Sequence, residues 1–565
     1  PHAEFAELRA WALAKLLWNP DQDVEALYAD FFSGYYGPAA KLVRTYFDEL
    51  HALVTPTEHV LRIWSPMTSA WYTDEFFSRA ARLWAEAEQL VENQPAYRYN
   101  VRMSAIPVLY ARVVRWPKMD VRHVWRDGAL RPEGVDPEYA ALARELLARI
   151  EEGKITHVSE SSERHQAFLA LLQGRSEGFT PRVVAGAGLT AGVVPQMGGR
   201  VASLARGDGP SFLHADAGGV DCAPNAASMT SREEEPYFVA KAEPASLALV
   251  RDVHHRYRIR RTVAATEQGL RVESAVTSSR VQPDTVRPVL RVALDLGDAA
   301  GVAARVGDGE WQKLTVPEDQ VFTAASLRGR ELAGQDVLIA SAATGRGVRV
   351  RLPNTPIERA LLFCDTRLGA VRLAVLASAQ PLPGRGTLAF PLILTPLDPV
   401  SGVPAIPVAK QHEPKRVVIE ECLINLGRPG AWGELVADPD AEDGFAAKLF
   451  NTHYEWCLQW PIEPRWFQPG AKYKARVRLR VAKSDREGEA FWAGVYDSAK
   501  KTGHGQIQPK TSEVRDGYQW YDVAAWTPED KQYVWVGPGR FDKQGGKPSA
   551  IEAVYVDRLE FTRAD

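Results

Sequence analysis

The apolar residues of the first 175 positions recur at helical spacing. Between residues 4 and 18 they form a broad arc made of Phe5, Leu8, Trp11, Ala12 and Leu16, with Leu13 and Leu17 beside them. So wide an arc predicts a helix that is covered on more than one side. Later runs predict further helices, including a single helix over residues 97–114, and the pattern ends at Gly174. We therefore expect a helical domain over residues 1–175.

From about residue 180 the pattern changes from helical to alternating. Short alternating runs separated by Gly, Pro and Asp, as in 257–266, 269–279 and 387–397, predict strands over residues 180–397. Residues 398–415 are rich in Pro without periodicity and predict an ordered linker. Strands return over 416–565, most clearly at 472–482, where apolar residues alternate with Lys and Arg. The chain is thus expected to be a multidomain α + β protein.

Length, charge and cysteine spacing limit the number of domains and the kinds of partner to expect. A chain of 565 residues is long enough for several domains. Its net charge of −3 gives no general attraction to nucleic acid, and no apolar run approaches a membrane span, for which about 20 residues are needed. The four cysteines show no zinc spacing; Cys422 and Cys457 either pair with each other or remain free buried thiols.

Tryptophan is the most suggestive residue type for function. The chain has 16 of them, and Trp supplies flat apolar faces on which sugar rings stack, although sandwich cores use Trp as well. Among those crowded into residues 416–565, we expect Trp456, Trp460 and Trp520 to be exposed platforms. The basic side of 472–480 either meets an acidic polysaccharide or is a solvated strand face. An aromatic loop at 62–67, followed by Trp71 and Tyr72, either borders a sugar cleft or packs over the helices.

The opening run ELRAWALAKLLWNPDQDVEALYADFFSGYYGPAA resembles the segment after the last barrel strand in bacterial glycoside hydrolases of the α-glucuronidase and hexosaminidase-like kind. The closest resemblance is to a family that carries a C-terminal domain of unknown function. It implies that this chain is the C-terminal part of a secreted, periplasmic or cell-surface protein. The catalytic (β/α) barrel would then lie outside the chain, as an N-terminal partner. The catalytic acids of those relatives come from the barrel, so no catalytic residue is assigned here.

Two further resemblances concern the β regions. LTAGVVPQMGGRVASLARGDG and YRIRRTVAATEQGLRVESAVTSS resemble strands of the galactose-mutarotase-like supersandwich, although neither His254 and His255 nor Glu233 to Glu235 match its active site. Residues 416–565 resemble a jelly-roll carbohydrate-binding module. The resemblance implies a structural calcium between first and last strands, held by Glu420 and Asp557, with an ion pair or a solvated acid as the other interpretation. The expected order is helical domain, β-supersandwich, then β-sandwich jelly roll.

These observations lead to three hypotheses. The first is the scaffold and carbohydrate-binding portion of a glycoside hydrolase that acts on polysaccharide or oligosaccharide. The second is a non-catalytic glycan-binding or cell-surface assembly protein. The third is a polysaccharide lyase, since lyases also join a helical domain to a supersandwich.

Overall fold

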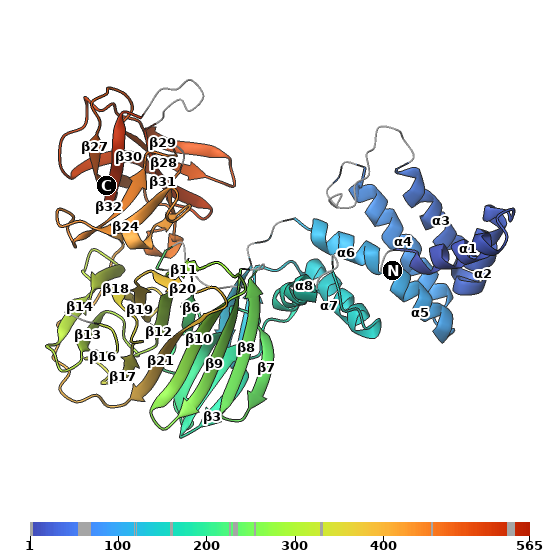
Figure 1. Cartoon of the computed structure of the whole chain (residues 1–565), viewed down its shortest axis with the longest axis horizontal. Coiled ribbons are helices and arrows are strands. Elements are labelled where there is room, and N and C mark those ends of the chain that lie inside the picture. Colours follow the sequence, from blue (N-terminus) through green and yellow to red (C-terminus); the bar gives the residue numbers. More distant parts are fainter. Residues whose placement is uncertain are drawn as a thin grey trace. The chain divides into compact units, whose positions relative to one another are not determined.

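The computed structural model describes residues 4–54, 69, 71–117, 119, 121–158, 162–224, 228–229, 235–253, 256–327, 332–453, 456–539 and 549–564. It divides into two compact units, residues 1–180 and 181–565. As the residue pattern predicts, an N-terminal helical region is followed by antiparallel β-sheets that make up most of the chain (Figure 1).

The first unit is helical. Its helices are α1 (Ala6–Trp18), α2 (Val24–Tyr36), α3 (Ala40–Ala52), α4 (Asp74–Leu90), α5 (Pro95–Ser104), α6 (Ile106–Arg115), α7 (Pro137–Glu152) and α8 (Ser162–Ser176). The single helix expected over 97–114 is two helices, because Pro107 lacks an amide hydrogen and suits the first turn of a new helix, α6. The sequence pattern also missed the hairpin of β1 (Arg122–Arg126) and β2 (Ala129–Glu133).

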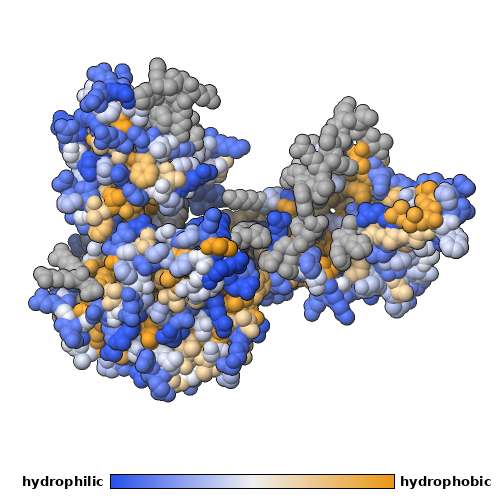
Figure 2. Space-filling model, viewed as in Figure 1, coloured by the Kyte–Doolittle hydropathy of each residue, from blue (hydrophilic) through white to orange (hydrophobic). Residues whose placement is uncertain are grey.

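Helix α1 is covered less than its sequence predicts. It buries Ala6, Leu8 and Ala12 against the unit's core, but Leu17 and Trp18 are 86% and 91% exposed. Leu13 and, on α2, Val24 are exposed as well, and apolar side chains gather over this end of the helical unit in Figure 2. Within the described residues, therefore, α1 is packed on one side only.

Residues 181–397 form a large β-sandwich, here called the first sandwich. Its nine-stranded sheet runs in the order β14-β13-β16-β17-β21-β10-β9-β8-β7, and its eight-stranded sheet in the order β15-β18-β19-β12-β6-β5-β4-β3. A pair, β11 (Asp284–Val286) and β20 (Gln380–Leu382), lies outside both sheets. One apolar core, including Val193, Ile259 and Leu394, fills the space between the sheets.

The strands of the first sandwich have these bounds: β3 (Arg182–Gly186), β4 (Leu189–Val194), β5 (Arg200–Arg206), β6 (Val220–Ala223), β7 (Phe238–Glu243), β8 (Ser246–Val253), β9 (Tyr257–Thr266), β10 (Gly269–Ser278), β12 (Val289–Leu294), β13 (Gly301–Val306), β14 (Gln312–Thr315), β15 (Phe322–Ser326), β16 (Asp336–Ser341), β17 (Gly347–Arg351), β18 (Ile357–Asp365), β19 (Ala370–Ala377) and β21 (Thr387–Leu397).

The glycine pair before Arg200 makes the turn between β4 and β5. Gly198 and Gly199 adopt φ values of 67° and 60°, a region that favours glycine. The fully buried Arg261 donates hydrogen bonds to the carbonyl oxygens of Gly198 and, at 2.6 Å, Cys222. Its charge therefore holds this turn inside the sandwich.

Residues 416–564 form the second sandwich. One sheet has the order β24-β25-β32-β27-β30, with β22 also paired to β32; the other has the order β23-β26-β31-β28-β29. Their bounds are β22 (Arg416–Glu420), β23 (Asn425–Leu426), β24 (Gly433–Ala437), β25 (Phe445–Phe450), β26 (Leu458–Pro461), β27 (Tyr473–Lys483), β28 (Phe491–Asp497), β29 (Thr502–Ile507), β30 (Gln519–Trp526), β31 (Gln532–Pro538) and β32 (Ile551–Arg563). All four cysteines of the chain are buried and free, so Cys422 and Cys457 are not paired.

The two sandwiches pack together along a contact that we call the seam. Trp466 of the second sandwich stacks on Phe322 of β15, with ring centroids 4.0 Å apart. Its indole nitrogen donates to Asp365 at 2.9 Å. Phe322 and Phe363 belong to the same apolar cluster as the core of the second sandwich. Lys415 of the linker and Arg416, the first residue of β22, also donate backbone hydrogen bonds to the carbonyl oxygen of Asp319 in the first sandwich.

Candidate functional site

An aromatic surface covers the outer side of the sheet β23-β26-β31-β28-β29. In β28 and β31, Val495 and Val534 point into the core, so the residues that alternate with them point outward. Tyr496 and Tyr533 are direct cross-strand partners, with ring centroids 5.6 Å apart. Trp535 lies beside them on β31, opposite Gly494, where any side chain would collide with the Trp535 ring.

Trp456 completes this surface, which we call the aromatic face (Trp456, Tyr496, Tyr533 and Trp535). Its ring centroid lies 6.0 Å from Tyr496, 5.8 Å from Tyr533 and 6.2 Å from Trp535. Trp456 is 38% exposed, while Trp535 is buried beneath its neighbours. A half-exposed indole held by three aromatic neighbours offers a rigid flat apolar surface, the kind of surface on which the C–H face of a sugar ring stacks.

The other two tryptophans expected to be platforms lie elsewhere. Trp460, on β26, is 4% exposed and packs on Phe561 at 5.1 Å. The expectation that Trp460 is exposed is therefore wrong, because its position in the strand directs the ring into the core. Trp520 is 36% exposed but belongs to β30 in the other sheet, and the Arg476 guanidinium covers its ring at 4.4 Å. Trp456, which packs against β28 and β31, and Trp520 of β30 are thus associated with different sheets.

The basic side of β27 is neutralised by carboxylates. Arg476 bonds Glu560 at 2.7 Å, and Arg480 bonds Asp438 at 2.8 Å. Arg478 pairs with Asp557, and Lys474 pairs with Asp522. This pairing favours the interpretation of β27 as a structural strand face rather than a surface for an acidic polysaccharide.

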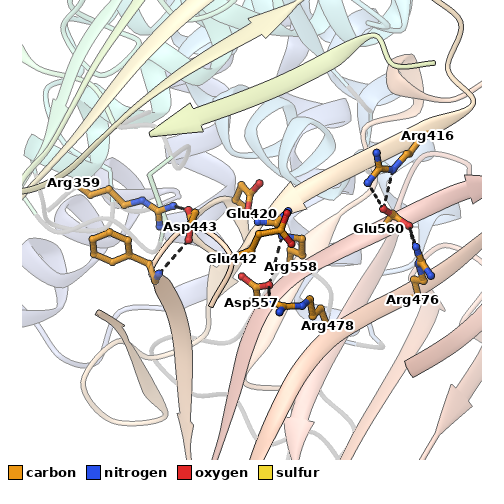
Figure 3. A network of polar contacts seen from close by, with 11 residues as sticks. Arg359, Arg416, Glu420, Glu442, Asp443, Arg476, Arg478, Asp557, Arg558 and Glu560 are labelled. Atoms are coloured by element: carbon orange, nitrogen blue, oxygen red, sulfur yellow. Dashed lines mark hydrogen bonds and ion pairs between the residues drawn. The ribbon is translucent and has the colours of Figure 1, made fainter. Parts of the chain in front are cut away.

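A cluster of one buried and two partly buried carboxyl groups lies at the seam. Glu420, Glu421 and Asp443 can each present an oxygen within 4.8 Å of the others, and we call them the carboxylate cluster. The buried Arg359 of β18 crosses the seam to pair with Asp443 (Figure 3) and with Glu421. Its guanidinium lies 4.6 Å from the centroid of the Phe445 ring. Two cluster oxygens, Oε2 of Glu420 and Oε2 of Glu421, are buried without a hydrogen-bond partner.

Burial and mutual repulsion perturb these carboxyl groups. Removal from water, reinforced by Asp443, raises the pKa of Glu421 to about 8 and that of Glu420 to about 7. The nearby arginines act in the opposite direction but do not cancel the effect. Carboxyl groups that resist ionisation, and that keep an oxygen without a hydrogen-bond donor beside their arginine partners, can serve as ligands for a hard cation.

The two residues expected to hold calcium are joined by an arginine instead. Arg558 lies 3.3 Å from Glu420, 3.6 Å from Asp557 and 3.1 Å from Glu442. As expected, Glu420 and Asp557 come from the first and last strands of this region, β22 and β32. The candidate ligand group, however, joins Glu420 to Glu421 and Asp443, not to Asp557. The Glu420-Glu421 doublet was the only sequence signal for Glu421.

Some residues singled out in the sequence lie outside the described residues. These are His254 and His255, Glu233 and Glu234, and the aromatic loop 62–67. Among the helices of the described residues, none is long and apolar enough to cross a membrane.

Comparisons with known proteins give partial matches. A family model described as a domain of unknown function, DUF4838, matches residues 1–48. No curated protein matches the chain. Among solved structures, a putative aldose 1-epimerase from Escherichia coli K12 is similar with a TM-score of 0.31 and 13% identity, over 39% of this chain and 99% of that one.

Two further solved structures are similar over the same extent. A galactose mutarotase related enzyme from Lactobacillus acidophilus has a TM-score of 0.32 and 8% identity, over 40% of this chain and 100% of that one. A galactose mutarotase-like protein from Lactobacillus casei has a TM-score of 0.30 and 10% identity, over 38% of this chain and 100% of that one.

Proposed function

We propose that this chain binds polysaccharide through the aromatic face of the second sandwich, as the scaffold and carbohydrate-binding portion of a secreted glycoside hydrolase. The observation that carries the proposal is the half-exposed Trp456, fixed by Tyr496, Tyr533 and Trp535. Aromatic rings ordered in this way lose little conformational freedom when a sugar ring stacks on them. The second sandwich would then act as a jelly-roll carbohydrate-binding module.

Replacing Trp456 by alanine is expected to weaken binding to an insoluble polysaccharide by about tenfold or more, since a stacking contact of 1.4 kcal/mol corresponds to a factor of ten. Depletion assays on cellulose, xylan, mannan and chitin, with the full chain, measure this loss. Trp520→Ala is the matched control, because Trp520 is equally exposed but lies on the opposite sheet. Loss of binding in the Trp520 variant alone would place the site on the other sheet and refute the proposal.

The exposed apolar side of α1 supports the proposal that the helical unit binds another protein domain. Leu13, Leu17 and Trp18 form an apolar surface of the kind that proteins cover with another domain. In the proposed assembly this partner is the catalytic (β/α) barrel. Product analysis after incubating the full gene product with a bound polysaccharide separates a hydrolase from a non-catalytic glycan-binding or assembly protein, which would release no sugar.

The carboxylate cluster is proposed to hold a structural calcium ion through Glu420, Glu421 and Asp443. Calcium added after chelation is expected to raise the free energy of unfolding of residues 181–565, by about 2.7 kcal/mol at a hundred times the dissociation constant. Calorimetry of the full chain measures this shift. Glu421→Gln is expected to abolish it, whereas Glu442→Gln, at a mostly exposed carboxyl outside the cluster, is expected to preserve it.

The effect of calcium is expected to grow with pH. Glu420 and Glu421 have pKa values above the ordinary 4.5, so the folded state holds more protons than the unfolded state between about pH 4.5 and 8. Without calcium, stability therefore falls as pH rises through this window. Calcium needs the ionised carboxylates and binds more tightly as they lose protons. A calcium effect that is equal at pH 5.5 and pH 8.5 would contradict ligation by these groups.

A further inference from the structure

A cleft of about 1130 Å³ opens at the edge of the first sandwich, on the side of the second sandwich. Two edge strands border it: β14 ends the nine-stranded sheet and β15 ends the eight-stranded sheet. The turn between β13 and β14 contributes residues 307–311, and the second sandwich contributes Glu442, Asp443 and Arg558. Its volume matches or exceeds that of small-molecule pockets, which is about 300–1,000 Å³.

Trp311 supplies a flat apolar wall to this cleft. It ends the turn of the β13–β14 hairpin and is half-buried. The Arg305 guanidinium lies 4.9 Å from the centroid of its ring, a cation–π contact that holds the indole in place. Trp311 lines the open cleft, and an indole held in this way is suited to stacking against a ring of a ligand.

Hydrogen-bonding groups stand around Trp311. Asp308 and Glu310 precede Trp311 in the same turn and are exposed, so their carboxylates can accept hydrogen bonds from ligand hydroxyls. On the opposite strand, the Ser326 hydroxyl is buried and has no hydrogen-bond partner. A buried hydroxyl without a partner is uncommon and indicates a place for a water molecule or a ligand hydroxyl.

The charge of the cleft selects among sugars. Its charged residues are four acids and two bases, namely Asp308, Glu310, Glu442, Asp443, Lys313 and Arg558. Arg558 is already paired with Glu442 and Glu420. Asp443 is paired with Arg359, so Asp308 and Glu310 are left against Lys313, an excess of one negative charge that disfavours an anionic, uronate-rich glycan.

We propose that this cleft is a second glycan-binding site, which takes an uncharged oligosaccharide by stacking one ring on Trp311. The ligand class rests on the proposed function, but the site shares no residue with the aromatic face. A long neutral chain that engages both sites gains affinity from the higher effective concentration at the second site, whereas a short one fills each site separately.

Titration calorimetry of the full chain with neutral hexasaccharides of glucose, xylose and mannose tests this proposal. Trp311→Ala is expected to remove one of two binding sites, or to weaken it by about tenfold, while Trp311→Phe keeps most of the binding. Trp456→Ala is expected to remove the other site. An unchanged melting temperature confirms that each variant is folded, and galacturonate and glucosamine hexamers test the charge argument.

The outcomes separate the two proposals. If only the Trp456 variant loses hexasaccharide binding, the proposal of a site in the cleft is wrong and that of a site on the aromatic face is supported. If only the Trp311 variant loses binding, the cleft site is supported and the aromatic-face site is wrong. Binding of only the galacturonate or only the glucosamine hexamer would refute the assignment to uncharged sugars. If no hexasaccharide binds to the wild-type chain, the cleft proposal is wrong, and the depletion assays on insoluble polysaccharide decide separately on the aromatic face.

Discussion

Replacing Arg359 by methionine is expected to cost roughly 3–5 kcal/mol of the stability of residues 181–565. Arg359 is buried and compensates Glu421 and Asp443, of which Glu421 is entirely buried. Without the guanidinium, these carboxyl groups lose their donor and, where ionised, their counter-charge. Denaturant unfolding of the full chain in the presence of a chelator measures the loss, since chelation prevents calcium from compensating.

The matched control for this variant is Arg351→Met. Arg351 also pairs with a carboxylate, Asp336 at 2.7 Å, but its side chain is 57% exposed. Water solvates both groups of such a pair, so this substitution is expected to change stability by less than about 1 kcal/mol. Equal losses of stability in the two variants would contradict the conclusion that Arg359 forms a buried ion pair with Glu421 and Asp443. The double variant Arg359→Met with Glu421→Gln is expected to recover part of the loss.

Replacing Trp466 by alanine is expected to uncouple the two sandwiches as well as destabilise them by roughly 3–5 kcal/mol. Trp466 is buried, stacks on Phe322 of the first sandwich and donates to Asp365. Its loss leaves a cavity in the seam and an acceptor without this donor. Calorimetry of residues 181–565 within the full chain should show one joint transition in the wild type and two separate transitions in the variant.

Trp526→Ala distinguishes coupling from simple destabilisation. Trp526 is also buried, and its indole nitrogen donates to Gln532 at 2.8 Å, but these contacts lie within the second sandwich. This variant is expected to lose comparable stability while the sandwiches still unfold together. If the Trp466 variant also unfolds in one transition, the seam does not couple the two sandwiches through this residue.

Local patterns were enough to predict much of the secondary structure. The strict alternation in 472–482 predicts a strand with Tyr473, Val477 and Leu479 on one side, and these residues are buried in β27. Alternation is visible in the sequence because successive side chains of a strand point to opposite faces, and the face that packs in the core needs apolar residues. The break between α5 and α6 was missed because Pro107 is also compatible with one continuous but kinked helix.

The candidate site was predicted only in part. Trp456 and Trp460 are four residues apart and look alike in the sequence, yet one is exposed and the other is in the core. A usable signal lay in β28 and β31, where Tyr496, Tyr533 and Trp535 alternate with core residues. The Trp311 cleft had no comparable signal, since its walls come from both sandwiches.

The sequence by itself determined the helical beginning, the long β region and the abundance of tryptophan, whose rings can stack on sugars. It did so because periodicity and composition are local properties of the chain. Only the tertiary structure decided which tryptophan ring is exposed, which arginine pairs with which carboxylate, and where the edges of two sheets form a cleft. Arg359 meets Glu421 from 62 positions away and Arg416 meets Glu560 from 144, and such pairings depend on how sheets stack, which no local pattern encodes.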